Sequence, residues 1–98
     1  MKIVINGGGG VGAALAEILS HLHHDVTMIE SDIRRADMLR GEVDCLVVTG
    51  NGASPVVLRE AGTDGADIFL AVTNQDEVNL LSCLFAREAG CPHSIARI

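Results

Sequence analysis

The chain has 98 residues and a mass of 10.3 kDa, the size of one small domain. Seven Lys and Arg against thirteen Asp and Glu give a formal net charge of −6, and aromatic residues make up only 2%. Nucleic-acid binding uses basic patches and stacking rings, so this composition argues against a nucleic-acid partner. Hydrophobic residues make up 48%, which is enough for a buried core. Because so few of them are aromatic, that core must consist of Val, Ile, Leu and Ala.

The same composition bounds the location and the chemistry. No apolar run is long enough to span a bilayer, so we expect no direct membrane insertion. Met1 leads straight into a strand pattern without room for a signal peptide, and three widely spaced Cys do not resemble a secreted disulfide framework. We therefore expect a cytoplasmic protein. Tyr is absent and Lys2 is the only Lys, which excludes Tyr–Lys dehydrogenase catalysis by this chain alone.

Strand and helix patterns alternate along the chain. In chain order, we predict a strand at Lys2–Asn6, a helix with apolar positions Val11, Ala14, Leu15, Ile18, Leu19 and Leu22, a strand at Asp25–Glu30, a helix at Asp32–Arg40, a strand at Cys45–Thr49, a helix from Ser54 to Gly62, a strand at Asp67–Val72, a helix from Thr73 or Asn74 to Gly90, and a strand at Ser94–Ile98. This alternation predicts an α/β fold, a Rossmann-like doubly wound parallel sheet of about five strands with helices on both faces.

Residues near the predicted helix ends support these boundaries. Asp32 and Ser54 are expected N-caps, and Gly41 and Gly62 follow the ends of their helices. An acid three residues after Thr73 or Asn74 is typical of a capping box, and we expect the buried face of that last helix to be Val78, Leu81, Leu84 and Phe85. A fold of this type usually continues to a sixth strand, so we expect one domain over residues 1–98, truncated before that strand.

The central motif is Gly7-Gly8-Gly9-Gly10-Val11-Gly12, directly after the first strand. In the pattern G-x-G-x-x-G, Gly7 allows a tight turn, Gly9 lets the backbone approach a pyrophosphate, and Gly12 lets the helix pack close to the sheet. The start of the helix then presents free N–H groups and a partial positive charge to phosphates. The alternative is a flexible glycine turn without a ligand. We favour a nucleotide site, because the motif lies between a strand and an amphipathic helix.

Glu30 ends the second strand, at the position of an acid that accepts hydrogen bonds from ribose hydroxyls. Ser31 follows it and is a further candidate ligand residue. The alternative for Glu30 is a solvated acid, or an acceptor at the start of the helix near Asp32. We interpret Asp32 as a helix cap, and we leave a phosphate or ribose role for Arg34 and Arg35 open.

Two further loops follow strands at the same predicted sheet edge. Thr49–Ser54 contains Asn51 and Gly52, which suit a loop against an adenine ring, although simple turn chemistry before a helix also explains them. Ala71–Asp76 contains Thr73 and Asn74, and it follows the strand opposite the first one at the expected switch point.

Together these segments resemble a known family. The stretches GGGGVG, VVTGNGASPVVLREAG, DIFLAVTNQDEVNLLSCLFA and ARI, with the strand-end Glu30, look like the TrkA N-terminal domain, also called RCK or KTN. The resemblance covers nearly the whole chain, and its most specific part is AVTNQDEVN together with the GNG loop. It implies a cytosolic domain that binds NAD(H) or ATP/ADP and regulates a potassium channel or transporter in the membrane, as a homodimer or a larger ring.

By position, the resemblance implies specific ligand contacts. Gly7, Gly9, Gly10, Val11 and Gly12 correspond to the phosphate loop, Glu30 to the ribose acid, Asn51 and Gly52 to the adenine loop, Thr73 and Asn74 to the loop near the second half of the ligand, and Arg97 to an Arg that can reach phosphates. Asn6, directly before the glycines, departs from the family's usual small or apolar residue.

Two other function classes stay open at this point. One is the cofactor domain of an NAD- or FAD-dependent oxidoreductase whose catalytic domain lies elsewhere. The other is a methyltransferase-like domain, which also uses a glycine-rich loop and a strand-end acid. The missing Tyr and the single Lys weigh against the first, and AVTNQDEVN has no place in the second. We expect no catalytic residues, and without Cys or acids at zinc spacing near His21 and His24 we expect no metal site.

Overall fold

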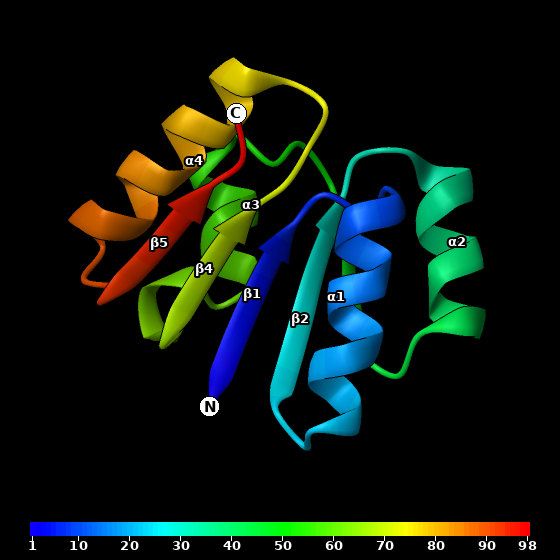
Figure 1. The fold of residues 1–98 in the computed structure, drawn as a ribbon. Helices are drawn as coiled ribbons and strands as arrows, with labels where there is room; N and C mark the ends of the chain where they lie inside the picture. The colour runs from blue at the N-terminus through cyan, green and yellow to red at the C-terminus, as the bar shows by residue number, and fades with distance from the viewer.

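A computed structural model describes all residues, 1–98, as five strands and four α-helices in alternation (Figure 1). The elements are β1 (Lys2–Asn6), α1 (Gly10–His21), β2 (Asp25–Glu30), α2 (Ile33–Glu42), β3 (Leu46–Thr49), α3 (Pro55–Glu60), β4 (Ile68–Ala71), α4 (Asp76–Glu88) and β5 (His93–Ala96), with a short 3₁₀ turn at Thr63–Gly65. The predicted order of elements is confirmed. The bounds of β1 and β2 are as predicted, and those of β3, β4 and β5 differ from the prediction by at most two residues.

The five strands form one parallel sheet in the order β3-β2-β1-β4-β5. The chain moves outward from β1 through β2 to β3, then returns to the other side of β1 for β4 and β5. The gap between the carboxyl ends of β1 and β4 is therefore the switch point, where open α/β sheets bind ligands. This topology confirms the predicted doubly wound, Rossmann-like fold.

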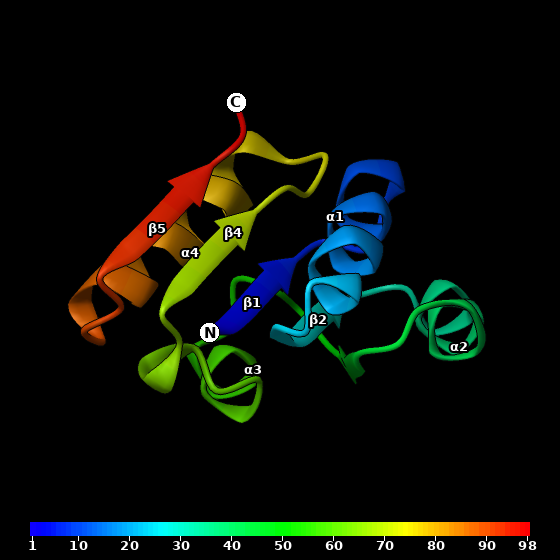
Figure 2. The same cartoon turned by 60° about the horizontal axis from the view of Figure 1, so that its bottom comes forward.

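Helices cover both faces of the sheet, α1 and α2 on one face and α3 and α4 on the other (Figures 1 and 2). Side chains alternate across the central strand, so Ile3 and Ile5 pack with α1 and α2, whereas Val4 packs with α3 and α4. Phe69 of β4 lies fully buried on the α4 side. Two apolar layers thus hold the sheet, and the strand ends above them are left to loops.

The predicted buried faces of α1 and α4 are partly wrong. Val11, Ile18 and Leu22 of the predicted α1 stripe are 42%, 56% and 61% exposed, and Ala14 is exposed as well. Gly12 and Ala16 are the residues of α1 that are buried. A helix packs closest to a sheet through its smallest side chains, so the large apolar residues lie on the flanks and outer side.

On α4, too, small or polar residues are buried and large apolar residues are exposed. Leu81 and Leu84 were expected in the core but are 57% and 58% exposed. The buried positions are instead Asn79, Ser82 and Ala86, with Val78 and Phe85 half-buried beside them. The outer side of α4 therefore carries exposed leucines.

The expected caps are confirmed for two helices and wrong for α4. The side chains of Asp32 and Ser54 accept hydrogen bonds from the N–H groups of Arg35 and Val57, and Gly62 takes the expected left-handed conformation with φ +83°. Gly41 lies inside α2 rather than after it. The N-cap of α4 is Gln75, without a side-chain bond, because the Thr73 hydroxyl is turned toward Asn79 instead.

None of these helices combines the length and the apolar character that crossing a bilayer requires.

Candidate functional site

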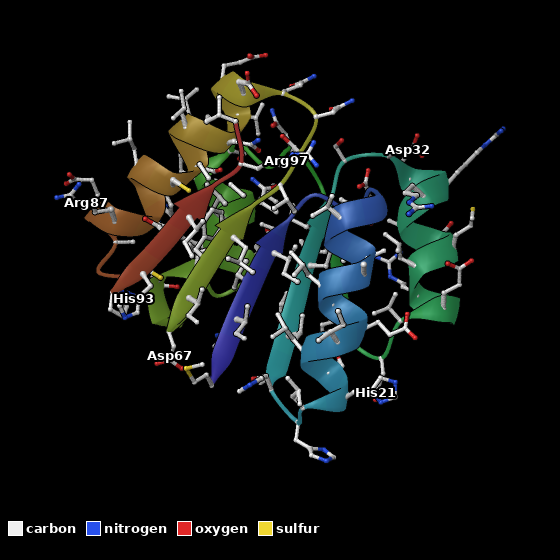
Figure 3. The ribbon with its side chains drawn as sticks, in the orientation of Figure 1. His21, Asp32, Asp67, Arg87, His93 and Arg97 are labelled. Carbon is white, nitrogen blue, oxygen red and sulfur yellow. The ribbon has the colours of Figure 1, made fainter.

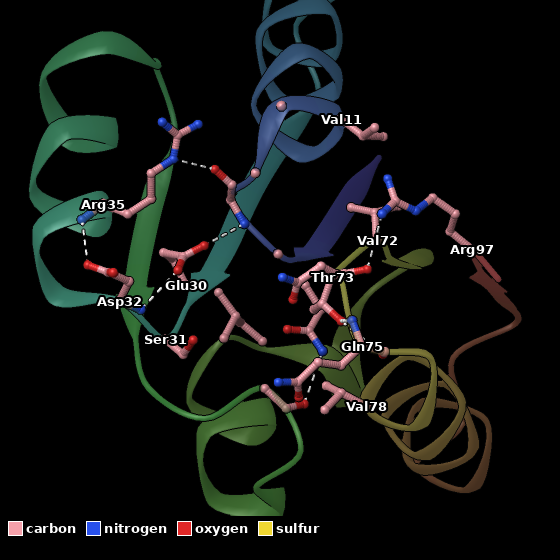
Figure 4. A pocket seen from close by; sticks show the side chains of 18 of the residues that line it. Val11, Glu30, Ser31, Asp32, Arg35, Val72, Thr73, Gln75, Val78 and Arg97 are labelled. Atoms are coloured by element: carbon pink, nitrogen blue, oxygen red, sulfur yellow. Dashed lines mark hydrogen bonds between the residues drawn. The ribbon is translucent and has the colours of Figure 1, made fainter.

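One cavity of about 620 Å³ opens at the carboxyl ends of the strands, at the switch point (Figure 4). Its volume is in the range of small-molecule sites. Figure 3 shows Asp32 and Arg97 at this end of the sheet, whereas Asp67 and His93 lie at the opposite end. Of the predicted site residues only Gly12 does not line the cavity; those that do are Gly7, Gly9, Gly10, Val11, Glu30, Ser31, Asn51, Gly52, Thr73, Asn74 and Arg97.

The three glycines of the G-x-G-x-x-G pattern differ in the space around them. Gly7 has φ +116°, and a Cβ there would lie 2.9 Å from the backbone nitrogen of Thr73, so the loop after β1 touches the loop after β4. A Cβ on Gly12 would collide with the Gly7 carbonyl oxygen. A Cβ on Gly9 would meet no atom within 4 Å, because Gly9 faces open space. The loop is thus tightly packed at its two ends and open in the middle.

Helix α1 begins at this open point without any side-chain cap. Its N-cap is Gly9, and the backbone N–H groups of Gly10, Val11 and Gly12 donate no hydrogen bond within the chain. Unpaired N–H groups and the positive end of the helix dipole make such a terminus favourable for an anion. An anionic ligand group in the cavity would therefore find donors already in place.

The Glu30 carboxylate is fixed by the backbone on two sides. Its Oε1 accepts from Gly8 N–H at 2.8 Å and its Oε2 accepts from Asp32 N–H at 2.9 Å. The bond from Asp32 matches the alternative interpretation, in which Glu30 is an acceptor at the start of a helix, because Asp32 is the N-cap of α2. Each carboxylate oxygen retains a further lone pair, so Glu30 can still accept from ligand hydroxyls in the cavity it lines.

Arg35 holds the same glycine from the other side, a contact that the sequence did not predict. Its Nε donates to the Gly8 carbonyl oxygen at 2.7 Å, so both backbone polar groups of Gly8 are bound (Figure 4). A Cβ on Gly8 would lie 2.8 Å from Oε1 of Glu30 and would also collide with Leu39. Gly8 is therefore as crowded as Gly7 and Gly12, the two outer glycines of the G-x-G-x-x-G pattern. Arg34 does not line the cavity.

Asn6 explains the position of the GNG loop. It is 1% exposed, and its Nδ2 donates to the carbonyl oxygen of Gly52 at 3.0 Å. A Cβ on Gly52 would collide with the Asn6 side chain. The departure from the family pattern at Asn6 thus ties the loop after β3 to the end of β1.

The far side of the cavity is formed by the loop after β4 and the end of β5. The Thr73 hydroxyl donates to Oδ1 of buried Asn79 at 2.7 Å, and the Arg97 guanidinium donates to the Thr73 carbonyl oxygen at 3.4 Å. The cavity residues absent from the predicted set are Asn6, Gly8, Ile29, Asp32, Arg35, Val72, Gln75 and Val78. Most of them adjoin a predicted residue in sequence, so extending each predicted loop by one residue would have found them.

The charges around the cavity are balanced, with Glu30 and Asp32 on one side and Arg35 and Arg97 as the cations. No Lys, His, Tyr or Cys lines it. Burial raises the pKa of the Cys45 and Cys83 thiols, but neither thiol is at the cavity. The site therefore offers hydrogen-bond donors and acceptors, without an imidazole, thiol, phenol or amine side chain.

Comparison with known proteins identifies related sequences. The profile of the TrkA-N domain matches residues 3–98. Proteins named Trk system potassium uptake protein TrkA homolog are 46% identical in Methanothermobacter thermautotrophicus and 48% identical in Archaeoglobus fulgidus, each over 98 residues and the whole of this chain. The chain spans 45% of the first relative and 22% of the second, so it covers less than half of either.

Solved structures share the fold at low sequence identity. The NAD(P)-binding domain of an exopolyphosphatase-related protein from Archaeoglobus fulgidus has a TM-score of 0.83 at 19% identity, over 98% of this chain and 71% of that one. The Kef CTD of Shewanella denitrificans, in an AMP-bound form, has a TM-score of 0.80 at 20% identity, over 97% of this chain and 57% of that one.

Proposed function

Because this chain belongs to the TrkA-N domain family, we propose that it is a regulatory nucleotide-binding domain, residues 1–98, of a potassium uptake system. The observation that carries the proposal is one cavity in which the unpaired N–H groups of α1 and the Glu30 carboxylate occur together. Phosphates suit the first and ribose hydroxyls suit the second. NAD(H) is the favoured ligand, with ATP or ADP as the alternative.

In the proposed complex the ligand lies across the switch point. The adenosine ribose contacts Glu30 and Ser31, the adenine lies against Asn51 and Gly52, and the phosphates lie over the glycine loop. The remainder of the ligand extends toward Thr73, Asn74 and Arg97. The sheet order β3-β2-β1-β4-β5 supports this path, because the segments after these strands supply the proposed contacts for the adenine, the ribose, the phosphates and the remainder of the ligand in that order.

The proposed partner is a membrane potassium channel or transporter, and the proposed place of action is the cytoplasmic side of the membrane. The names of the curated relatives support this partner, since they describe a potassium uptake system. The bound nucleotide would act as a signal that changes the domain's contact with that partner.

The alternative of an oxidoreductase cofactor domain has less support. A hydride transfer to a carbonyl needs a proton donor near the nicotinamide, and the cavity residues include no Tyr, Lys, His or Cys. The curated relatives are named for potassium uptake rather than for a reaction.

Titration calorimetry with NADH, NAD, ATP, ADP and AMP tests the proposal, with GMP and inorganic pyrophosphate as controls. We expect saturable binding of the adenine nucleotides and weaker binding of both controls. Pyrophosphate binding as tight as NADH binding would mean that the loop is a plain anion site. Absence of binding by every adenine nucleotide would contradict the proposed function.

A further inference from the structure

Asn79 is a buried amide that does not line the cavity, yet it contacts residues that do. It lies in the first turn of α4, is 0% exposed, and is the last residue of the AVTNQDEVN block. A buried amide without partners is costly, so its hydrogen bonds decide what it contributes.

The Asn79 side chain uses all of its hydrogen-bonding capacity on two segments. Its Oδ1 accepts from the Thr73 N–H at 3.0 Å and from the Thr73 hydroxyl at 2.7 Å. Its Nδ2 donates to the Thr73 carbonyl oxygen at 3.1 Å and to the Arg97 carbonyl oxygen at 2.8 Å. A carboxamide has two acceptor lone pairs and two N–H donors, so none is left unpaired.

Through these bonds one side chain joins the loop after β4 to the residue after β5. Arg97 also binds the end of β4 directly, since its backbone N–H donates to the Ala71 carbonyl oxygen at 2.9 Å. Thr73 and Arg97 lie together on one side of the cavity, and Glu30 and Arg35 lie on the other (Figure 4). Asn79 therefore organises only the side that is remote from the ribose acid.

We propose that Asn79 is a positioning residue that sets the affinity for the part of the ligand beyond its first phosphate. This inference rests on the proposed function. Asn79 holds Thr73 and Arg97 in place before binding. A ligand that reaches them therefore loses less conformational entropy on binding, and its affinity is higher. AMP ends at its single phosphate, over the glycine loop, and does not reach them.

Calorimetry of Asn79→Ala with NADH, ATP and AMP tests this. The substitution removes all four hydrogen bonds of the Asn79 side chain, so we expect NADH and ATP to bind at least about tenfold more weakly. AMP binding should change by less than about threefold, which is within the range of one weak contact. Ser82→Ala is the matched control, because Ser82 is also buried on α4 but its hydroxyl donates its one hydrogen bond to the Asn79 carbonyl oxygen and none to Thr73 or Arg97.

Asn79→Asp provides a second variant of nearly the same shape. It keeps an acceptor for Thr73 but loses the N–H donors to the Thr73 and Arg97 carbonyl oxygens. We expect it to weaken NADH and ATP relative to AMP as well. In the unaltered protein, amide hydrogen exchange provides a test that does not depend on a variant folding, because the Thr73 N–H should be protected although it lies in a loop.

Equal loss of AMP, NADH and ATP affinity would show that Asn79 only holds the fold, and would overturn the inference while leaving the proposed function intact. Unchanged NADH and ATP affinity in a folded variant, or a Thr73 amide that exchanges as fast as an exposed loop, would overturn it too. An unaltered protein that binds none of these nucleotides would overturn the proposed function and this inference together.

Discussion

Glu30 combines two functions in one carboxylate. It holds the Gly8 N–H of the glycine loop and, under the proposed function, also accepts from the ribose. A 2′-phosphate placed against it would bring like charges together in a cleft, and such contacts cost several kcal/mol, or about a hundredfold or more in affinity.

We therefore expect NADH to bind about a hundredfold more tightly than NADPH. Glu30→Gln should narrow this preference, because it removes the charge while its amide oxygen can still accept from Gly8. Titration calorimetry of both proteins with both cofactors measures the ratio. Equal or tighter binding of NADPH by the unaltered protein would contradict the assignment of Glu30 to the ribose.

Two glycines of one loop should respond differently to the same substitution. Gly9 faces open space, so Gly9→Val should lower the free energy of unfolding by only about 1 kcal/mol, from a poorer N-cap, while abolishing nucleotide binding. Gly12→Val places a side chain against the Gly7 carbonyl, and should cost about 3 kcal/mol of stability. Urea unfolding and calorimetry measure both effects. A Gly9→Val protein that binds nucleotide normally would show that the phosphates lie elsewhere.

At the scale of elements, α4 and β5 leave an apolar surface exposed. Leu80, Leu81 and Leu84 of α4 are 52%, 57% and 58% exposed, and β5 is an edge strand with no partner on its outer side. Exposed apolar residues next to an unpaired strand edge are typical of a protein interface.

We predict self-association through this surface, in its simplest form a two-fold dimer. Leu80→Glu and Leu84→Glu should each weaken it by placing a charge in an apolar contact, and sedimentation at high micromolar concentration measures the effect. Ile33→Glu is the matched control, because Ile33 is 69% exposed but lies on α2, on the other face of the sheet. A monomer, or a dimer that neither α4 substitution weakens, would refute the prediction.

For the molecule as a whole, the proposed regulatory function predicts that a bound cofactor does not donate hydride. Lys2 begins β1, whereas the cavity lies at the carboxyl end of that strand. The purified chain should therefore not oxidise NADH with small carbonyl substrates. Absorbance at the NADH band, with a dehydrogenase as positive control, measures this; steady turnover that Gly9→Val abolishes would overturn the regulatory proposal.

The α/β alternation, the glycine loop and the position of Glu30 at a strand end could all be predicted from the sequence. These features are local, since periodicity, glycine spacing and cap residues act within a few positions of the chain. The carboxyl ends of parallel strands also share one edge, so the predicted loops were expected to meet, and every predicted residue except Gly12 lines the cavity.

The buried faces of the helices and the polar groups that support the cavity could not be predicted in this way. Periodicity placed Leu81 and Leu84 in the core, but close packing on the sheet selects the smaller residues Ser82 and Ala86. The bonds of Arg35 to Gly8 and of Asn79 to Arg97 join residues 27 and 18 positions apart. Such partners depend on how separate elements are placed in space, and no local pattern in the chain encodes that placement.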